Sequence, residues 1–171
     1  MPGEIAIDHE DYYPFQFEAD IEYHHLGSYR YTVVFLDERL HGCLPLAEHP
    51  RLRTSGELRD IPFDGAWQPV RGRWYLMLSK PQMRAGAFEV GDRVQVRFRI
   101  EDQDAVEVPA ELRLMLEGRP RLERVWGGLT AGKRRGLAHR VASAKTAPTR
   151  ERRLAEVAAT LADADADADD R

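Results

Sequence analysis

The chain has 171 residues, of which 43% are apolar and 32% charged, and its formal net charge at pH 7 is −4. A core of ordinary size can form, but no apolar run is long enough to span a membrane and the first residues lack the features of a signal peptide. The single cysteine, Cys43, excludes an intramolecular disulfide bond. We therefore expect a cytoplasmic protein and exclude disulfide-stapled and membrane-spanning classes.

The first hundred residues predict short antiparallel strands after an acidic, irregular segment at 1–14. In residues 15–23, apolar and polar side chains alternate strictly, which indicates a strand with one buried face. A second strand is expected at 29–36, the segments 51–67 and 72–80 supply two or three further strands broken by glycine and proline, and 91–102 supplies the last. They predict a small antiparallel β-barrel of five to six strands, which we assign to a domain at 15–104.

Charged residues on the outer faces of the first and last predicted strands have opposite signs. The first strand carries Glu18, Asp20 and Glu22, and the last carries Arg93, Arg97 and Arg99. If these two strands pair, the side chains form a cross-strand ladder that fixes the register. Each exposed pair would contribute only about 0–1 kcal/mol, so we interpret the ladder as structural.

After Asp104 the apolar period changes from two to 3.6, which predicts a bundle of three to four short helices at 105–163. Pro109 and Gly118 bound one helix, and Thr130 and Thr146 are suited to cap two others. Apolar stripes that would face the core are formed by Leu122, Val125, Trp126 and Leu129, by Leu137, Val141 and Ala144, and by Leu154, Val157 and Leu161. Residues 164–171 alternate alanine and aspartate without bulky apolar side chains, so we predict a disordered acidic tail. The overall fold class is α+β.

Positive charge is concentrated in the helical part of the chain. Residues 119–153 hold eleven basic and two acidic residues, a net charge of +9, whereas the rest of the chain carries −13. Two basic groups begin helices, where the helix dipole disfavours cations by about 0.3–1 kcal/mol each. A charge asymmetry of this kind indicates a negative partner, inside or outside the protein.

We assign a candidate anion or partner site to the basic helix starts. Its residues are Lys133, Arg134, Arg135, Lys145, Thr149, Arg150 and Arg153. One hypothesis pairs them with internal carboxylates, such as Asp102, Asp104, Glu107 or the acidic tail. The other is an external anion held by arginine and free backbone N–H groups. We favour the internal hypothesis, and we expect Arg150, four residues before Leu154, to be partly buried and paired.

The helical part resembles the bacterial YdeI/OmpD-associated family, also described as bacteriocin-protection. The residues that carry the resemblance are Trp126, Leu129, Thr130 and the run Ala144, Lys145, Thr149, Arg150 and Arg153. The segment "FEVGDRVQVRF" resembles a small β-barrel domain of unknown function that often precedes this family. Asp60 stands where that barrel often has glycine. The resemblance implies a fold and a family name, and it implies no catalytic residues.

No pattern in the sequence predicts catalysis, a cofactor or a metal. Cys43 precedes the apolar run Leu44-Pro45-Leu46, so we expect a buried, inert thiol. His24 and His25 are neighbours on a strand and point to opposite faces, so they cannot bind one metal together.

The function that we predict is therefore a non-enzymatic binding or stress-protection protein with an unknown protein or small anion as its partner. A nucleic-acid-binding protein that uses the basic helical surface is the alternative, which the acidic tail disfavours. We regard an enzyme with a site at the barrel mouth as a weaker alternative, because small barrels usually fill their interior with side chains. The sequence does not indicate the oligomeric state.

Overall fold

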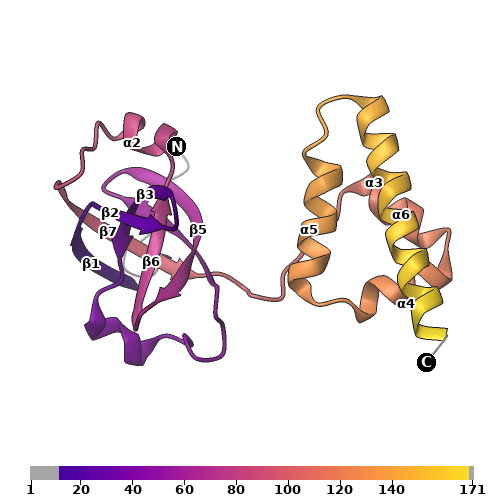
Figure 1. Ribbon diagram of the computed structural model, residues 1–171, viewed down its shortest axis with the longest axis horizontal. Coiled ribbons are helices and arrows are strands. Elements are labelled where there is room, and N and C mark those ends of the chain that lie inside the picture. The colour runs from indigo at the N-terminus through magenta and orange to yellow at the C-terminus, as the bar shows by residue number, and fades with distance from the viewer. Residues whose placement is uncertain (1–11, 170–171) are drawn as a thin grey trace, which may run out of the picture. The chain divides into compact units, whose positions relative to one another are not determined.

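The computed structural model describes residues 12–169, which divide between Asp102 and Gln103 into two compact units (Figure 1). The first is a curved antiparallel sheet, here called the sheet unit, and the second is a group of helices, here called the helical unit. Among residues 12–169, no helix combines the length and the apolar composition that crossing a bilayer requires. The change of apolar period near Asp104 thus correctly places the change from strands to helices.

The sheet unit contains seven antiparallel strands that curl into a half-barrel, in the order β1-β7-β4-β5-β6-β3-β2. The strands are β1 (Phe15–Asp20), β2 (Glu22–Leu26), β3 (Tyr29–Phe35), β4 (Leu52–Leu58), β5 (Ile61–Val70), β6 (Arg73–Leu78) and β7 (Arg93–Ile100). A 3₁₀ helix, η1 (Glu38–Cys43), lies between β3 and β4, and a short helix, α2 (Lys80–Ala85), follows β6.

The sheet has seven strands rather than the predicted five to six, because the chain breaks at Ile21 into two strands where we expected one. We expected one strand over 15–23, but β1 pairs with β7 and β2 pairs with β3. The backbone of Ile21 instead bonds the turn before β7: its N–H donates to the Asp92 carbonyl oxygen and its own carbonyl oxygen accepts from Gly91, both at 2.8 Å. Strict alternation cannot reveal this break because the Ile21 side chain remains fully buried.

The concave side of the sheet holds the core of this unit. Trp67 and Phe98 are fully buried, and their rings meet edge to face with centroids 5.3 Å apart. Aliphatic side chains from the neighbouring strands complete the core, among them Leu52, Leu58, Leu76, Val94 and Val96. Cys43 is exposed, which corrects our expectation of a buried thiol; Leu44 and Leu46 beside it enter the core instead.

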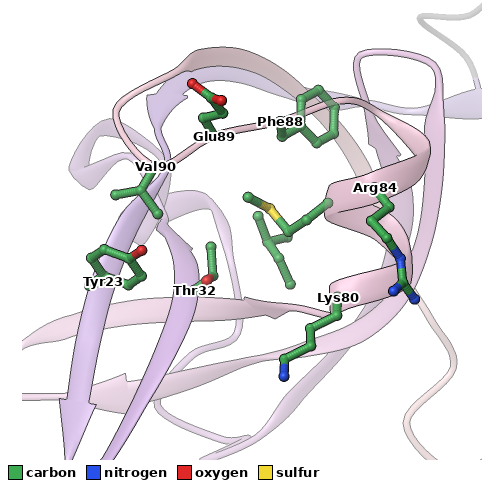
Figure 2. Close-up of a pocket in the computed structure, with 9 residues that line it drawn as sticks. Tyr23, Thr32, Lys80, Arg84, Phe88, Glu89 and Val90 are labelled. Atoms are coloured by element: carbon green, nitrogen blue, oxygen red, sulfur yellow. The ribbon is translucent and has the colours of Figure 1, made fainter.

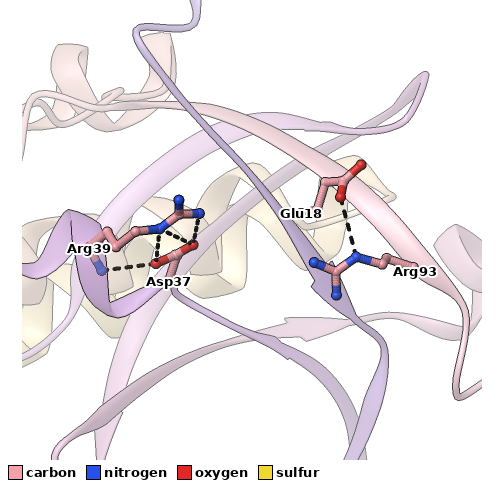
Figure 3. A network of polar contacts seen from close by, with 4 residues as sticks. All are labelled: Glu18, Asp37, Arg39 and Arg93. Atoms are coloured by element: carbon pink, nitrogen blue, oxygen red, sulfur yellow. Dashed lines mark hydrogen bonds and ion pairs between the residues drawn. The ribbon is translucent and has the colours of Figure 1, made fainter.

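The predicted charge ladder exists only at Arg93. This side chain contacts Glu18 at 3.3 Å and Asp20 at 3.2 Å, and Figure 3 shows the contact with Glu18. The other members pair elsewhere: Arg97 with Glu57, Arg99 with Glu101 and Glu22 with Arg73. The register explains the difference, because Arg97 lies opposite Gln16, and Glu22 belongs to β2 rather than to β1.

Asp37 caps the N-terminus of η1 by accepting hydrogen bonds from Arg39. Its carboxylate accepts the Arg39 backbone N–H at 2.9 Å and the guanidinium Nη2 at 2.6 Å (Figure 3). Hydrogen bonds from the Arg39 side chain, followed by the one from its backbone N–H, lower the pKa of Asp37 to about 2. A lowered folded-state pKa means that the ionised form stabilises the fold.

We therefore expect the contribution of Asp37 to stability to be complete above its ordinary pKa near 4 and to be lost as the pH falls toward 2. In the Arg39→Ala variant, the pKa of Asp37 should rise toward its ordinary value. Carboxyl-carbon NMR titration of both proteins measures this directly. Equal Asp37 titration curves in the two proteins would contradict the assignment of the shift to Arg39.

The helical unit contains four helices within the described residues. They are α3 (Ala110–Glu117), α4 (Pro120–Gly128), α5 (Ala131–Ala142) and α6 (Ala147–Asp169). The predicted caps are present: Thr130 Oγ1 accepts the Lys133 N–H at 3.3 Å, and Thr146 Oγ1 accepts the Thr149 N–H at 3.4 Å. Fully or nearly fully buried side chains from all four helices form one core, in which Leu112, Trp126, Val141, Val157 and Leu161 take part.

Helix α6 extends into the segment that we predicted to be a disordered tail from residue 164. It continues to Asp169, and Arg121 of α4 contacts Asp165 at 3.2 Å and Asp169 at 3.4 Å. Alanine has the highest helix propensity, and an arginine on the neighbouring helix offsets part of the repulsion among the aspartates. The composition argument was wrong for 164–169, because it counted apolar burial and omitted these two effects.

Candidate functional site

The seven predicted site residues fall into two groups at opposite ends of α5. Lys133, Arg134 and Arg135 lie in its first turns. Lys145 and Thr149 lie at the junction between α5 and α6, together with Arg150 and Arg153. From Lys133 to the end of α5 at Ala142 the helix rises by roughly 14 Å, and Lys145 lies three residues beyond that end. The structure therefore divides the predicted single site into an α5 start and a helix junction.

At the helix junction, Arg150 has internal partners. Its guanidinium contacts the Glu111 carboxylate of α3 at 3.3 Å and donates to the Ala144 carbonyl oxygen at 3.2 Å. Its side chain is 36% exposed, so the prediction of a partly buried, paired arginine is confirmed. The carboxylate partner is Glu111, which was not among the acids that we named.

Arg153 joins the same junction to the end of α5. It donates to the Arg140 carbonyl oxygen at 2.7 Å and to Ser143 Oγ at 2.9 Å. The last carbonyl groups of a helix lack partners within the helix and carry the negative end of its dipole. The cations at the start of α6 thus bond the negative end of α5, which explains why they occur beside a helix N-terminus.

At the start of α5, Arg135 also bonds the backbone. It donates to the Gln103 carbonyl oxygen at 2.6 Å and to the Ala105 carbonyl oxygen at 3.2 Å. Its two neighbours differ from it. Across residues 12–169, neither the Lys133 ammonium nor the Arg134 guanidinium forms a hydrogen bond or ion pair, and Arg134 Nε is shielded from solvent.

An apolar groove adjoins this unpaired charge, and sequence reasoning missed it. The groove has a volume of about 370 Å³ and lies between α5 and α6. Its lining consists of Leu129, Lys133, Gly136, Leu137, Thr160, Leu161 and Ala164. The Thr160 hydroxyl donates to the Glu156 carbonyl oxygen of its own helix at 2.9 Å. The exposed lining is almost entirely apolar, although Lys133 is one of its residues.

Gly136 creates much of the space in this groove. A Cβ atom at this position would meet no heavy atom within 4 Å, and the same is true of Gly132 one turn earlier. Glycine inside a helix costs about 1 kcal/mol relative to alanine, and packing within the helical unit does not require it here. Two glycines one turn apart in α5 were the signal in the sequence that could have indicated an open helix face.

An ion pair joins α5 and α6 one helical turn from the groove. Arg140 of α5 contacts Glu156 of α6 at 2.7 Å. Arg140 follows Gly136 by four residues, and Glu156 precedes Thr160 by four, so the pair lies one helical turn beyond the groove on both helices. The groove therefore extends from this pair toward Lys133 and Ala164.

The helical unit matches a known protein family. The model of the family described as "Bacteriocin-protection, YdeI or OmpD-Associated" matches residues 105–164, which contain α3 to α5 and most of α6. This match confirms the resemblance of the helical part to the family. Among curated proteins, none matches the chain. The resemblance of the sheet unit to a small barrel domain stays a prediction.

Proposed function

We propose that this chain is a non-enzymatic binding protein of the protective class that the family description names. In this proposal the helical unit binds an acidic partner with apolar side chains in the groove between α5 and α6. The observation that carries the proposal is an open apolar groove that has an unpaired lysine, Lys133, among its lining residues. Apolar contact supplies affinity in such a groove, and the charge selects an acidic partner.

The internal contacts of the basic residues favour the groove, rather than the helix junction, as the binding site. Arg150 and Arg153 already bond acceptors that belong to the helical unit. Lys133 and Arg134 have no such partners within the described residues, and Lys133 also lines the groove. A negative group beside Lys133 would therefore gain an ion pair without breaking an internal bond.

The nature of the groove favours an amphipathic helix as the ligand. Three leucines line the groove: Leu129 at the end of α4, Leu137 of α5 and Leu161 of α6. A helix that presents leucine on one face and glutamate on the other would place apolar side chains between α5 and α6 and carboxylates near Lys133. An acidic amphipathic peptide is therefore the appropriate probe.

Binding of a fluorescein-labelled peptide of this kind, measured by anisotropy, tests the proposal. We expect the wild-type protein to bind the Leu/Glu peptide and to bind a Leu/Lys peptide of the same length much more weakly. Gly136→Leu should weaken binding by roughly tenfold or more, because the leucine side chain fills the groove. Gly132→Leu is the matched control, since Gly132 has open space around it, lies in the same helix and does not line the groove.

Two charge-reversal variants distinguish peptide binding in the groove from nucleic-acid binding. Lys133→Glu should weaken peptide binding, whereas Arg124→Glu, an exposed cation of α4 outside the groove lining, should not. The alternative is supported if duplex DNA binds with a steep salt dependence and both reversals weaken it equally. Peptide binding that is unaffected by Gly136→Leu and Lys133→Glu would overturn the proposal.

A further inference from the structure

A second cavity lies in the sheet unit, where the core ends at one mouth of the curved sheet (Figure 2). Tyr23, Thr32 and Leu78 stand opposite one another on β2, β3 and β6. Each is two residues from a fully or almost fully buried core residue, namely Ile21, Val34 and Leu76. Because side chains alternate along a strand, these three point to the same side as the core and form the layer above it.

The pocket above this layer has a volume of about 430 Å³, within the usual range for small-molecule sites. Met83 of α2 and Phe88 and Val90 of the following loop complete its apolar lining. Tyr23 and Val90 are 48% and 37% exposed, which is unusual for large apolar side chains beside a packed core. The pocket thus offers apolar surface that the chain itself leaves uncovered.

The charges around the pocket are mainly positive. Lys80 and Arg84 lie one helical turn apart on α2, and neither has a side-chain hydrogen bond or ion pair within residues 12–169. Like charges at this spacing repel each other. The Arg30 guanidinium lies over the Tyr23 ring, 4.0 Å from its centroid. Glu89 is the acid of the lining, and Figure 2 shows its carboxylate at the opposite side of the pocket from Lys80.

Two hydroxyl groups, those of Tyr23 and Thr32, line the strand side of the pocket. Figure 2 shows the Tyr23 hydroxyl directed toward Thr32, with Lys80 and Arg84 on the α2 side of the pocket. Hydroxyl and ammonium donors around an apolar floor are suited to an anion that is attached to an apolar body. A purely apolar ligand would leave the two cations unpaired, and a free inorganic anion would leave the floor uncovered.

We propose that this pocket binds a small organic anion, a carboxylate or phosphate with an apolar body about the size of an aromatic ring system. Lys80 at the rim holds the anionic group, Arg84 on the outer side of α2 adds positive charge at longer range, and Leu78, Met83 and Phe88 contact the apolar body beside the Tyr23 and Thr32 hydroxyls. The site lies within the sheet unit and is independent of the groove between α5 and α6. A test of ligand binding at this pocket therefore does not decide the proposed function of the helical unit.

Isothermal titration calorimetry of the full chain with three probes tests this ligand class. The probes are 1-naphthyl phosphate, 1-naphthoate and the neutral 1-naphthalenemethanol. We expect at least one of the two anions to bind at least tenfold more tightly than the neutral alcohol, and their ratio decides between phosphate and carboxylate. Inorganic phosphate alone should bind more weakly than 1-naphthyl phosphate. Equal affinity for the neutral and anionic probes, or no binding of either naphthyl anion, would overturn the proposal.

Variants and mapping locate the binding. The double variant Lys80→Gln/Arg84→Gln should bind the anion at least tenfold more weakly than the wild-type protein. The double variant Arg51→Gln/Arg71→Gln removes the same amount of exposed charge outside the lining and should keep wild-type affinity. Amide chemical shifts of the wild-type protein provide a test that needs no variant. They should change at Thr32, Leu78 and Phe88 on addition of the probe. Shift changes confined to the helical unit, or unchanged affinity in the first variant, would place the ligand elsewhere.

Discussion

The Gly56→Ala variant is expected to lose about 3 kcal/mol of unfolding free energy in the sheet unit, the largest effect that we expect from a single methyl group. Gly56 lies in β4 and pairs with Phe98 of β7. A Cβ atom there would collide with the Arg97 carbonyl oxygen and lie 2.8 Å from the Phe98 Cα atom. Both obstacles are backbone atoms of the neighbouring strand, so no side-chain rotation relieves the contact.

The collision matters because β4 and β7 are neighbours and neither is an edge strand of the sheet. Moving β7 away from Gly56 would also disturb Val96 and Phe98, which are fully buried. The cost therefore includes lost packing as well as lost backbone hydrogen bonds. Gly42→Ala is the matched control, because a Cβ atom at Gly42 meets no heavy atom within 4 Å.

Urea denaturation followed by tryptophan fluorescence measures this effect. A Trp126→Phe background removes the signal of the helical unit and leaves Trp67 and Trp74 as reporters of the sheet unit. We expect a clearly lower midpoint for Gly56→Ala and a midpoint within error of the parent for Gly42→Ala. Parent-like stability of Gly56→Ala would mean that β4 and β7 are farther apart than the structure places them.

The apolar period of the sequence predicted the elements of both units because burial on one face is a local property. Alternation at Phe17 and Ala19, and again at Val94 and Val96, located strands that the structure contains. The stripe of Leu122 and Trp126 located α4 in the same way. Local rules failed at Ile21, where the backbone changes partner while the side chain remains in the core.

The sites depended on contacts between distant segments, which the sequence shows less directly. Arg153 bonds a backbone carbonyl at the end of α5, and every residue carries such a group, so composition cannot identify the acceptor. The pocket of the sheet unit combines Tyr23, Thr32 and Leu78 from three strands, and only the register brings them into one row. Lys80 and Arg84 at one-turn spacing were the local signal for that pocket.

The last prediction concerns the helix junction, where Arg150 and Arg153 join α6 to its neighbours. Replacing both with alanine should destabilise the helical unit by about 3 kcal/mol, because hydrogen bonds to charged groups contribute roughly 1.5–3 kcal/mol each and solvent weakens the partly exposed pair with Glu111. The double variant leaves Glu111 without this partner and removes the donors at the Arg140 and Ala144 carbonyl oxygens. Arg150→Ala alone should cost about 1–3 kcal/mol.

Arg152 provides the matched control between these two positions. Its side chain is 69% exposed, and it approaches Glu156 only at 3.9 Å. Arg152→Ala removes the same charge from the same turn of α6, and its effect on the free energy of unfolding should lie within about 0.5 kcal/mol of zero.

Urea denaturation followed by the fluorescence of Trp126 compares the three variants, in a background with Trp67 and Trp74 replaced by phenylalanine. If Arg152→Ala costs as much as Arg150→Ala, the effect is one of charge alone. If all three are neutral, the junction is held by the apolar core of Val141, Val157 and Leu161, and the arginines of α6 are available to an external anion.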